Sequence, residues 1–181
     1  MNIIFIVGPG GVGKTSCGEI LSKNINYDFI DLDVVFCEDI KNITDYIKEE
    51  GYKSYCYKNS ELFEFILNEI KQNTVFVLSS GFLVHEELES LVKKHLNLIS
   101  SFGISILILP DKDIDRSTQI VVGRQMKRPW KLCEEKEALK FRSRFNKYLK
   151  FGDIKIFSLE KPDVIAKIIE KALKDKGFML I

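Results

Sequence analysis

The stretch Gly8-Pro-Gly-Gly-Val-Gly-Lys-Thr15 follows an apolar run, Ile3–Val7, and precedes a segment with apolar residues at helical spacing, 16–23. This order of buried strand, glycine-rich turn and helix start matches the Gly-x-x-x-x-Gly-Lys-Thr pattern of a phosphate-binding P-loop. A glycine-rich turn that binds nothing is the alternative, and the complete spacing weighs against it. The stretch therefore predicts a nucleotide-phosphate site at the end of the first strand.

Each residue type in this loop has a physical role in holding phosphates. Glycines allow positive φ and let backbone N–H groups converge on an anion, and the following helix adds the positive end of its dipole. Lys14 is placed to neutralise β- and γ-phosphate charge, and the Thr15 hydroxyl is placed to ligate Mg²⁺. The predicted cofactors are ATP and Mg²⁺. The predicted nucleotide-binding residues of the loop are Gly8, Gly10, Gly11, Val12, Gly13, Lys14, Thr15 and Ser16.

Length and composition limit the possible classes of protein. The 181 residues fit one domain, 1–181, with a core that needs no cross-links. A formal net charge of +1 provides no global basic field for nucleic acid. The four cysteines lack metal-ligand spacing, and the apolar N-terminal run is too short for a signal peptide or a membrane span. We therefore expect a cytoplasmic monomer or weak homodimer that acts on a small molecule, with neither nucleic acid nor a membrane as partner.

Two carboxylates stand close together in the second predicted strand, 27–33. Asp31 and Asp33 are two residues apart, so both side chains would point to one side of an extended chain. In open parallel sheets, ligands gather at the carboxyl ends of the strands. One carboxylate is thus a candidate for the Mg²⁺ site, and the other for accepting a proton from an attacking hydroxyl. A pair of solvated loop acids is the alternative.

Segments with the pattern of buried strands alternate with segments that have the period of helices. The predicted strands are 3–7, 27–33, 74–78, 104–109 and 153–157. The predicted helical segments are 16–23, 38–72 with a division at Gly51, 86–99, 134–150 and 164–172. Five strands that alternate with helices indicate a single α/β domain with a parallel sheet and right-handed crossovers.

Further site candidates lie at a strand end and between the helices. Ser79-Ser80-Gly81 follows the third strand and has small side chains where a substrate can approach closely. The stretch 51–59 is too aromatic for an ordinary linker, so it either lines a pocket or packs on the helices. His95 is expected on a partly covered helix face and His85 in a loop or at a helix start, and neither is assigned a role.

Basic residues gather in the segment after the fourth strand, 111–131. This segment contains few acids beside Arg116, Arg124, Lys127, Arg128 and Lys131. In a P-loop fold, such a cluster is expected to form a lid that closes over phosphates and supplies positive charge when closed. A solvated basic helix is the alternative.

The order of these features along the chain is typical of one family: the P-loop, Asp31-x-Asp33, the small-residue strand tip, Arg128-Pro129, and Arg144 four residues before Tyr148. In this order the chain resembles the shikimate kinase family over nearly its whole length. The resemblance implies a sheet of strand order 2-3-1-4-5 with helices on both faces. It also implies an acceptor-binding helical region over 38–72 and a lid over 111–131.

The resemblance implies roles for individual residues as well. Asp33 would be the base that meets the substrate hydroxyl, Arg128 would reach the transferred phosphate, and Arg144 would bind the substrate carboxylate. The implied catalytic residues are Lys14, Asp33 and Arg128. The implied substrate-binding residues are Asp33, Ser80, Gly81 and Arg144. The implied metal ligands are Thr15 and Asp31, and Arg124 is a candidate for the adenine side of the site.

Two stretches depart from the family pattern, both in the acceptor half of the site. The family has three glycines at the strand tip, where this chain has Ser79-Ser80-Gly81. The family also has Gly-Glu-x-x-Phe-Arg, whose arginine shares the substrate carboxylate, where this chain has Gly51-Tyr-Lys-Ser-Tyr-Cys56. A thiol does not replace the bidentate contact of an arginine, and the loss costs about 1.5–3 kcal/mol of binding.

Three functions fit these observations. The first is an ATP- and Mg²⁺-dependent kinase that phosphorylates a hydroxyl of a small anionic, carboxylate-bearing metabolite, with shikimate as the leading candidate. The second keeps this chemistry and changes the acceptor to another polyol or hydroxy acid, because of Cys56, Ser79 and Ser80. The third is a non-catalytic nucleotide-binding module, and the presence of both Asp31 and Asp33 speaks against it.

Overall fold

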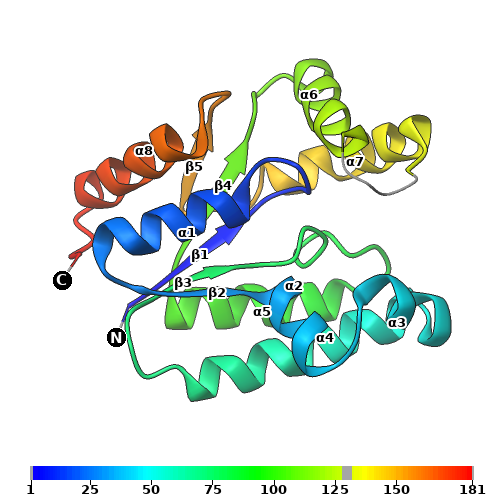
Figure 1. Cartoon of the computed structure of the whole chain (residues 1–181), viewed down its shortest axis with the longest axis horizontal. Helices are drawn as coiled ribbons and strands as arrows, with labels where there is room; N and C mark the ends of the chain where they lie inside the picture. The colour runs from blue at the N-terminus through cyan, green and yellow to red at the C-terminus, as the bar shows by residue number, and fades with distance from the viewer. Residues whose placement is uncertain (1, 128–131, 181) are drawn as a thin grey trace.

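The apolar run that precedes the glycine loop forms the central strand of a parallel sheet. The computed structural model describes residues 2–127 and 132–180, and this strand, Ile3–Val7, is buried along its whole length. The five strands are β1 (Ile3–Val7), β2 (Asp28–Asp31), β3 (Thr74–Val77), β4 (Gly103–Leu109) and β5 (Ile154–Phe157). All neighbouring strands pair in parallel, in the order β2-β3-β1-β4-β5 (Figure 1). The predicted α/β class, parallel sheet and strand order are confirmed.

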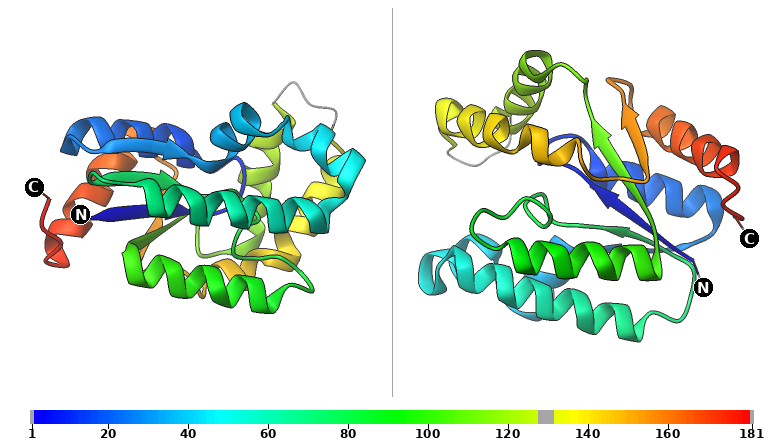
Figure 2. Two further views of the ribbon diagram at one scale, coloured as in Figure 1. Left: turned by 90° about the horizontal axis from the view of Figure 1, so that it is seen from below. Right: turned by 180° about the vertical axis from the view of Figure 1, so that it is seen from behind.

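Helices cover both faces of this sheet. They are α1 (Lys14–Ile25), α2 (Leu32–Asp39), α3 (Ile43–Glu50), α4 (Tyr52–Glu69), α5 (Glu89–Phe102), α6 (Ile114–Met126), α7 (Glu134–Tyr148) and α8 (Pro162–Asp175). Two successive residues of β1 mark the two faces: Ile6 faces α1, and the ring of Phe5 lies 6.1 Å from that of Phe63 in α4. α1 packs against α8 on one side, and α4 packs against α5 on the other (Figure 2). None of the helices within the described residues combines the length and apolar character needed to cross a membrane.

α1 lies close to the sheet because it has a glycine at the contact. A Cβ on Gly18 would lie 2.7 Å from Val77 Cγ2 and 3.2 Å from Ile6 Cδ1, so a larger residue would push the helix away. Dense packing of this kind leaves little room for movement. The contact therefore fixes the start of α1, and with it the glycine loop, over the carboxyl ends of β1 and β3.

The second strand ends earlier than the sequence pattern predicts. The strand expected over 27–33 is β2, and α2 begins at Leu32. Asp31 ends the strand and caps the helix, because its Oδ1 accepts a hydrogen bond from the backbone N–H of Asp33 at 3.0 Å. The expectation that both carboxylates point to one side of an extended chain is therefore wrong, since Asp33 lies in the first turn of α2.

The helical region expected over 38–72 contains α3 and α4, which separate at Gly51 as predicted. The aromatic stretch 51–59 belongs to α4, which begins at Tyr52, and Tyr55 follows the alternative of packing on the helices. Tyr55 is buried, and its ring lies 5.1 Å from that of Phe36 in an edge-on contact. Aromatic residues at helical spacing thus join α4 to α2.

His95 lies in the interior, and the expectation of a partly covered helix face is wrong. It has no solvent exposure, its ring stacks 3.9 Å from that of Phe82, and its Nε2 lies 2.8 Å from Ser60 Oγ. Burial lowers the pKa of His95 to about 4. Burial also lowers the pKa of His85, the other histidine, to about 4. Both imidazoles are therefore neutral in the folded protein near pH 7.

Acidification should destabilise the fold through these two histidines. Their pKa values lie below the value of about 6.5 in an unfolded chain, so the unfolded state binds more protons between pH 6.5 and 4. We expect the free energy of unfolding, measured by urea titration, to fall as the pH is lowered through this window. His95→Gln should reduce the slope of stability against pH. An identical slope in the variant would contradict the assignment.

Candidate functional site

The glycine loop adopts a backbone conformation that side chains would prevent. Gly8 has a φ of 146°, and a Cβ there would lie 2.5 Å from the backbone oxygen of Ile108 in β4. Gly13 has a φ of 89° and caps α1 without any side-chain hydrogen bond. The backbone N–H groups of the first turn of α1 therefore point into the loop, which is the arrangement that binds anions.

Lys14 and Thr15 lie where the sequence places them, at the start of α1. Lys14 is only 9% exposed, and its Nζ donates to the backbone oxygen of Pro9 at 3.1 Å. Thr15 Oγ1 donates to Asp31 Oδ2 at 2.7 Å, across from α1 to the end of β2. A hydroxyl and a carboxylate in contact are hard oxygen donors of the kind that Mg²⁺ prefers, so this pair fits a Mg²⁺ ion.

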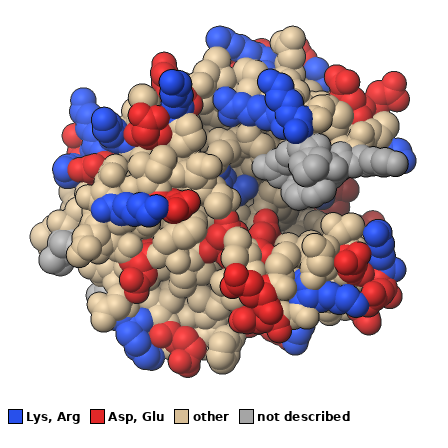
Figure 3. All heavy atoms as spheres, viewed as in Figure 1, with Lys and Arg blue, Asp and Glu red and all other residues tan. Residues whose placement is uncertain are grey.

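These groups surround a cavity of about 160 Å³ at the carboxyl end of the sheet. It is lined by Gly10, Gly11, Gly13, Lys14, Thr15, Ser16, Asp31, Asp33, Val77, Leu78 and Ser80. On the face drawn in Figure 3, the surface is hollowed between the α6 side, where basic side chains gather, and the α2 side, where acidic side chains gather. The fold thus brings together the loop and both carboxylates that the sequence singled out.

A chain of two hydrogen bonds orients the Asp33 side chain. Ser79 Oγ donates to Asp33 Oδ1 at 2.5 Å, and Asn59 Nδ2 donates to Ser79 Oγ at 3.0 Å. Asn59 is fully buried, and its Nδ2 also lies 3.4 Å from the hydroxyl of Tyr55. Ser79 therefore fixes the orientation of the Asp33 carboxylate at the edge of the cavity, and sequence reasoning did not anticipate this role.

His85 also belongs to this region, although sequence reasoning assigned it no role. Its Nδ1 lies 3.1 Å from the hydroxyl of Tyr52 and 3.3 Å from Cys56 Sγ, both in the first turns of α4. The hydroxyl of Tyr52 lies 3.0 Å from the point where a Cβ on Gly81 would lie. Burial raises the pKa of the Cys56 thiol to about 11. The one sequence signal for His85 was its position shortly after the third strand, because ligands gather at the carboxyl ends of parallel strands.

α7 also contributes residues to the site, at Ser80 and Gly81. Tyr148 Oη donates to the backbone oxygen of Ser80 at 2.5 Å, and Arg144 Nη1 lies 3.8 Å from the Cβ position of Gly81. A second cavity of about 190 Å³ opens here, and Gly10 and Ser80 line both cavities. Its lining residues are Pro9, Gly10, Ser80, Gln125, Leu132, Glu137, Lys140, Phe141, Arg144 and Tyr148.

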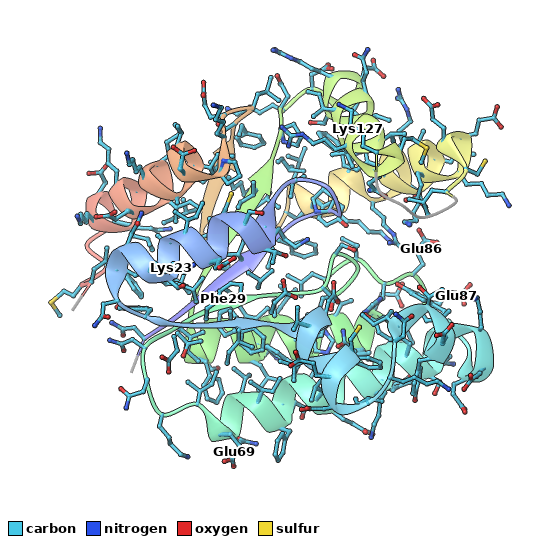
Figure 4. The ribbon with its side chains drawn as sticks, viewed as in Figure 1. Lys23, Phe29, Glu69, Glu86, Glu87 and Lys127 are labelled. Carbon is cyan, nitrogen blue, oxygen red and sulfur yellow. The ribbon has the colours of Figure 1, made fainter. Side chains whose placement is uncertain are left out.

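α6 brings the described part of the predicted lid against the glycine loop. Gln125 Nε2 donates to the backbone oxygen of Gly10 at 3.1 Å, and Arg124 Cβ lies 3.7 Å from the Cβ position of Gly11. Lys127, labelled in Figure 4, caps the end of α6. Arg128, the predicted lid arginine, lies outside the described residues.

The fold and the loop define a class of protein: a P-loop protein of the small kinase fold, with its site at the carboxyl ends of parallel strands. The family model described as shikimate kinase matches residues 10–174, and the chain belongs to the shikimate kinase family. The predicted family is thereby confirmed.

Individual relatives agree with this family. The shikimate kinase of Haemophilus influenzae (strain PittEE) is 38% identical over 109 residues, which cover 58% of this chain and 54% of that protein, so the alignment spans about half the relative's length. A structure of Acinetobacter baumannii shikimate kinase in complex with shikimate has a TM-score of 0.77 at 17% identity and covers 99% of this chain and 96% of its own. A Sinorhizobium meliloti gluconokinase has a TM-score of 0.59 at 13% identity, covering 98% and 96%. These structures share the fold.

Removing the Ser79 hydroxyl should destabilise the protein. Ser79→Ala removes the 3.0 Å acceptor of the buried Asn59 amide and leaves it only the longer 3.4 Å contact with the Tyr55 hydroxyl, and a poorly satisfied buried polar group costs about 1–3 kcal/mol. We expect a loss of this size in the free energy of unfolding from urea titration, whereas Ser100→Ala, at an exposed position of α5, should change it little. Equal stability of the two variants would show that the Tyr55 hydroxyl alone satisfies the Asn59 amide.

Proposed function

We propose that this protein is an ATP-dependent kinase that transfers the γ-phosphate to a hydroxyl of a small anionic metabolite. The proposal is supported above all by one cavity that Lys14, the Thr15–Asp31 pair and Asp33 all line. A phosphate-binding loop alone serves many proteins, whereas a second carboxylate beside it provides a base for an acceptor hydroxyl. The family, to which the chain belongs, supports the same chemistry.

The loop side of the site would hold the nucleotide. The N–H groups at the start of α1 would bind phosphate oxygens. The Lys14 ammonium, which donates to the Pro9 backbone oxygen, would instead contact the β- and γ-phosphates. Thr15 and Asp31 are the residues that would hold Mg²⁺, which neutralises charge on the phosphates when bound. Arg124, beside Gly11, remains the candidate for the adenine side.

Asp33 would act on the acceptor. Its carboxylate is oriented by Ser79 and by its place in the first turn of α2, so it can accept the proton of an incoming hydroxyl at a fixed position. Ser80 and Gly81 at the tip after β3, and Arg144 from α7, would bind the rest of the acceptor. Arg128 would supply charge to the transferred phosphate from the lid segment, 111–131.

Shikimate is the leading candidate for the acceptor, and one observation favours a different hydroxy acid as the second candidate. The hydroxyl of Tyr52 lies over Gly81, and Cys56 contacts His85 where the family has an arginine. The two α4 positions, Tyr52 and Cys56, therefore carry no positive charge, although Lys53 and Lys58 lie in the same turns of the helix. An acceptor with its acid group elsewhere, or with a different ring or chain, would suit this arrangement better.

Asp33→Asn tests the reaction itself. The amide keeps the size of the side chain and does not accept a proton from the hydroxyl, so we expect kcat to fall about 10²–10⁴-fold with MgATP binding retained. ADP release is measured with shikimate and with other hydroxy acids. Asp39→Asn, at the exposed end of α2, is the matched control and should keep wild-type kcat. Full turnover in Asp33→Asn would reject Asp33 as the base.

Arg128→Ala tests the lid. An arginine that reaches the transferred phosphate in the transition state contributes about 10³–10⁵ in kcat, so its loss should lower kcat by that factor. Arg116→Ala removes the same side chain at an exposed position of the same segment and should have little effect. If Arg128→Ala turns over at nearly the wild-type rate, the lid arginine lies elsewhere.

A further inference from the structure

α6 lies in direct contact with the glycine loop, although the two segments are far apart in the chain (Figure 1). A Cβ on Gly11 would lie 3.2 Å from the backbone oxygen of Val121 and 3.2 Å from Gln125 Cγ. Val121 is fully buried, and Gln125 follows it by one helical turn, so both lie on the side of α6 that faces the loop. The loop and the helix therefore pack without room for a side chain on Gly11.

A hydrogen bond crosses this contact. Gln125 Nε2, at a half-buried position, donates to the backbone oxygen of Gly10 at 3.1 Å. The preceding carbonyl, that of Pro9, accepts from Lys14 Nζ, also at 3.1 Å. Lys14 lines the 160 Å³ cavity where phosphates would bind, whereas Gln125 does not. Gln125 can therefore keep its hydrogen bond when that cavity is filled.

The carbonyl that Gln125 holds determines where the next backbone N–H points. The peptide between Gly10 and Gly11 is trans, so its C=O and its N–H point in opposite directions. Because the carbonyl is held on the α6 side, the N–H of Gly11 is directed away from α6. Gly11 lines the 160 Å³ cavity, and its N–H has no acceptor among the residues that the structure describes. An open backbone donor in a turn of this kind is a group that binds phosphate oxygens.

Two successive glycines cannot fix this orientation by themselves. Neither Gly10 nor Gly11 has a Cβ, and Gly11 adopts a positive φ of 84°, so the peptide between them can rotate with little steric cost. A donor that comes from outside the loop removes this freedom before a ligand arrives. A site that is ordered in advance binds its ligand more tightly, because less conformational entropy is lost on binding.

We propose that Gln125 is a positioning residue of the nucleotide site, which holds the peptide between Gly10 and Gly11 so that the Gly11 N–H is ready to donate to a phosphate oxygen. The inference rests on the proposed kinase function and adds a residue of the lid segment, 111–131, to the groups that prepare the loop. Because Gln125 lies on α6, the docking of this helix and the binding of phosphates are linked, and each favours the other.

Gln125→Met tests the proposal, because methionine has nearly the same length and donates no hydrogen bond. Calorimetry measures the binding of two probes, MgADP and magnesium tripolyphosphate, and the second has neither a base nor a sugar. We expect both affinities to fall by a similar factor, about 2- to 12-fold, which is the size of one neutral hydrogen bond. Gln125→Glu keeps the size of the side chain and also removes the donor, so it should lose at least as much.

Gln119→Met is the matched control, since Gln119 is an exposed glutamine of the same helix, and this variant should bind both probes as the wild type does. NMR provides a readout that needs no ligand. The nitrogen shift of a backbone amide responds to a hydrogen bond on the preceding carbonyl, so the Gly11 signal of the free protein should move in Gln125→Met. The same signal should stay in place in Gln119→Met.

The proposal is wrong if the wild type does not bind tripolyphosphate, if Gln125→Met binds both probes as the wild type does, if Gln119→Met shows an equal loss, or if the Gly11 signal does not move. A loss for MgADP alone would also overturn it, because the effect would then lie on the adenine side, near Arg124, and not at the loop. Failure of the kinase function has a different signature. It would appear as absent ADP release in the wild type, or as full turnover in Asp33→Asn, with the tripolyphosphate affinity of Gln125→Met still reduced.

Discussion

The carboxylate of Asp31 joins the parts of the molecule on which the site depends. One oxygen accepts the hydroxyl of Thr15 from α1 at 2.7 Å, and the other accepts the backbone N–H of Asp33 at 3.0 Å. A single side chain therefore ties the glycine loop to the end of β2 and also starts α2. Because it starts α2 there, Asp33 is carried on a helical turn and directed to Ser79. Loss of this one carboxylate would remove both the Thr15 contact and the cap that orients Asp33.

The strands and most helices could be predicted from the sequence because their signals are local. Five residues of β1 are apolar and buried, and the two parts of the 38–72 region are divided by a glycine with positive φ. The order of the strands had no local signal and came from resemblance. The turn at Asp31 was missed because a capping carboxylate looks the same as a strand-end carboxylate in sequence. The full burial of His95 was missed because it depends on Phe82 and Ser60, which are distant in the chain.

The candidate site likewise contains some residues that the sequence predicts and some contacts that only the fold creates. Lys14 and Thr15 follow from spacing alone, since a P-loop is a continuous segment whose geometry is encoded in its glycines. The contacts of Ser79 with Asp33 and of His85 with Cys56 join residues 46 and 29 positions apart, so only the fold brings them together. The departures at Cys56 and Ser79 were visible in sequence as missing family residues. Their contacts in the structure, the hydrogen bond of Cys56 to His85 and that of Ser79 to Asp33, were not visible in sequence.

The two halves of the site are under different physical constraints, which explains why one is preserved and the other changed. Under the proposed function, phosphates bind to backbone N–H groups and to Lys14, and the loop tolerates few side chains: a Cβ on Gly8 would lie 2.5 Å from a backbone oxygen of β4. The acceptor wall is made of side chains, and a charged wall is stable only when its charges are paired or reach an anion. At the start of α4, Tyr52 and Cys56 stand where the family pattern has glutamate and arginine, so this pair of opposite charges is absent from these two positions. Under the proposed function, the positive charge for an acid group would come from other residues. Arg144 of α7, which lines the 190 Å³ cavity beside the strand tip, is placed for this role.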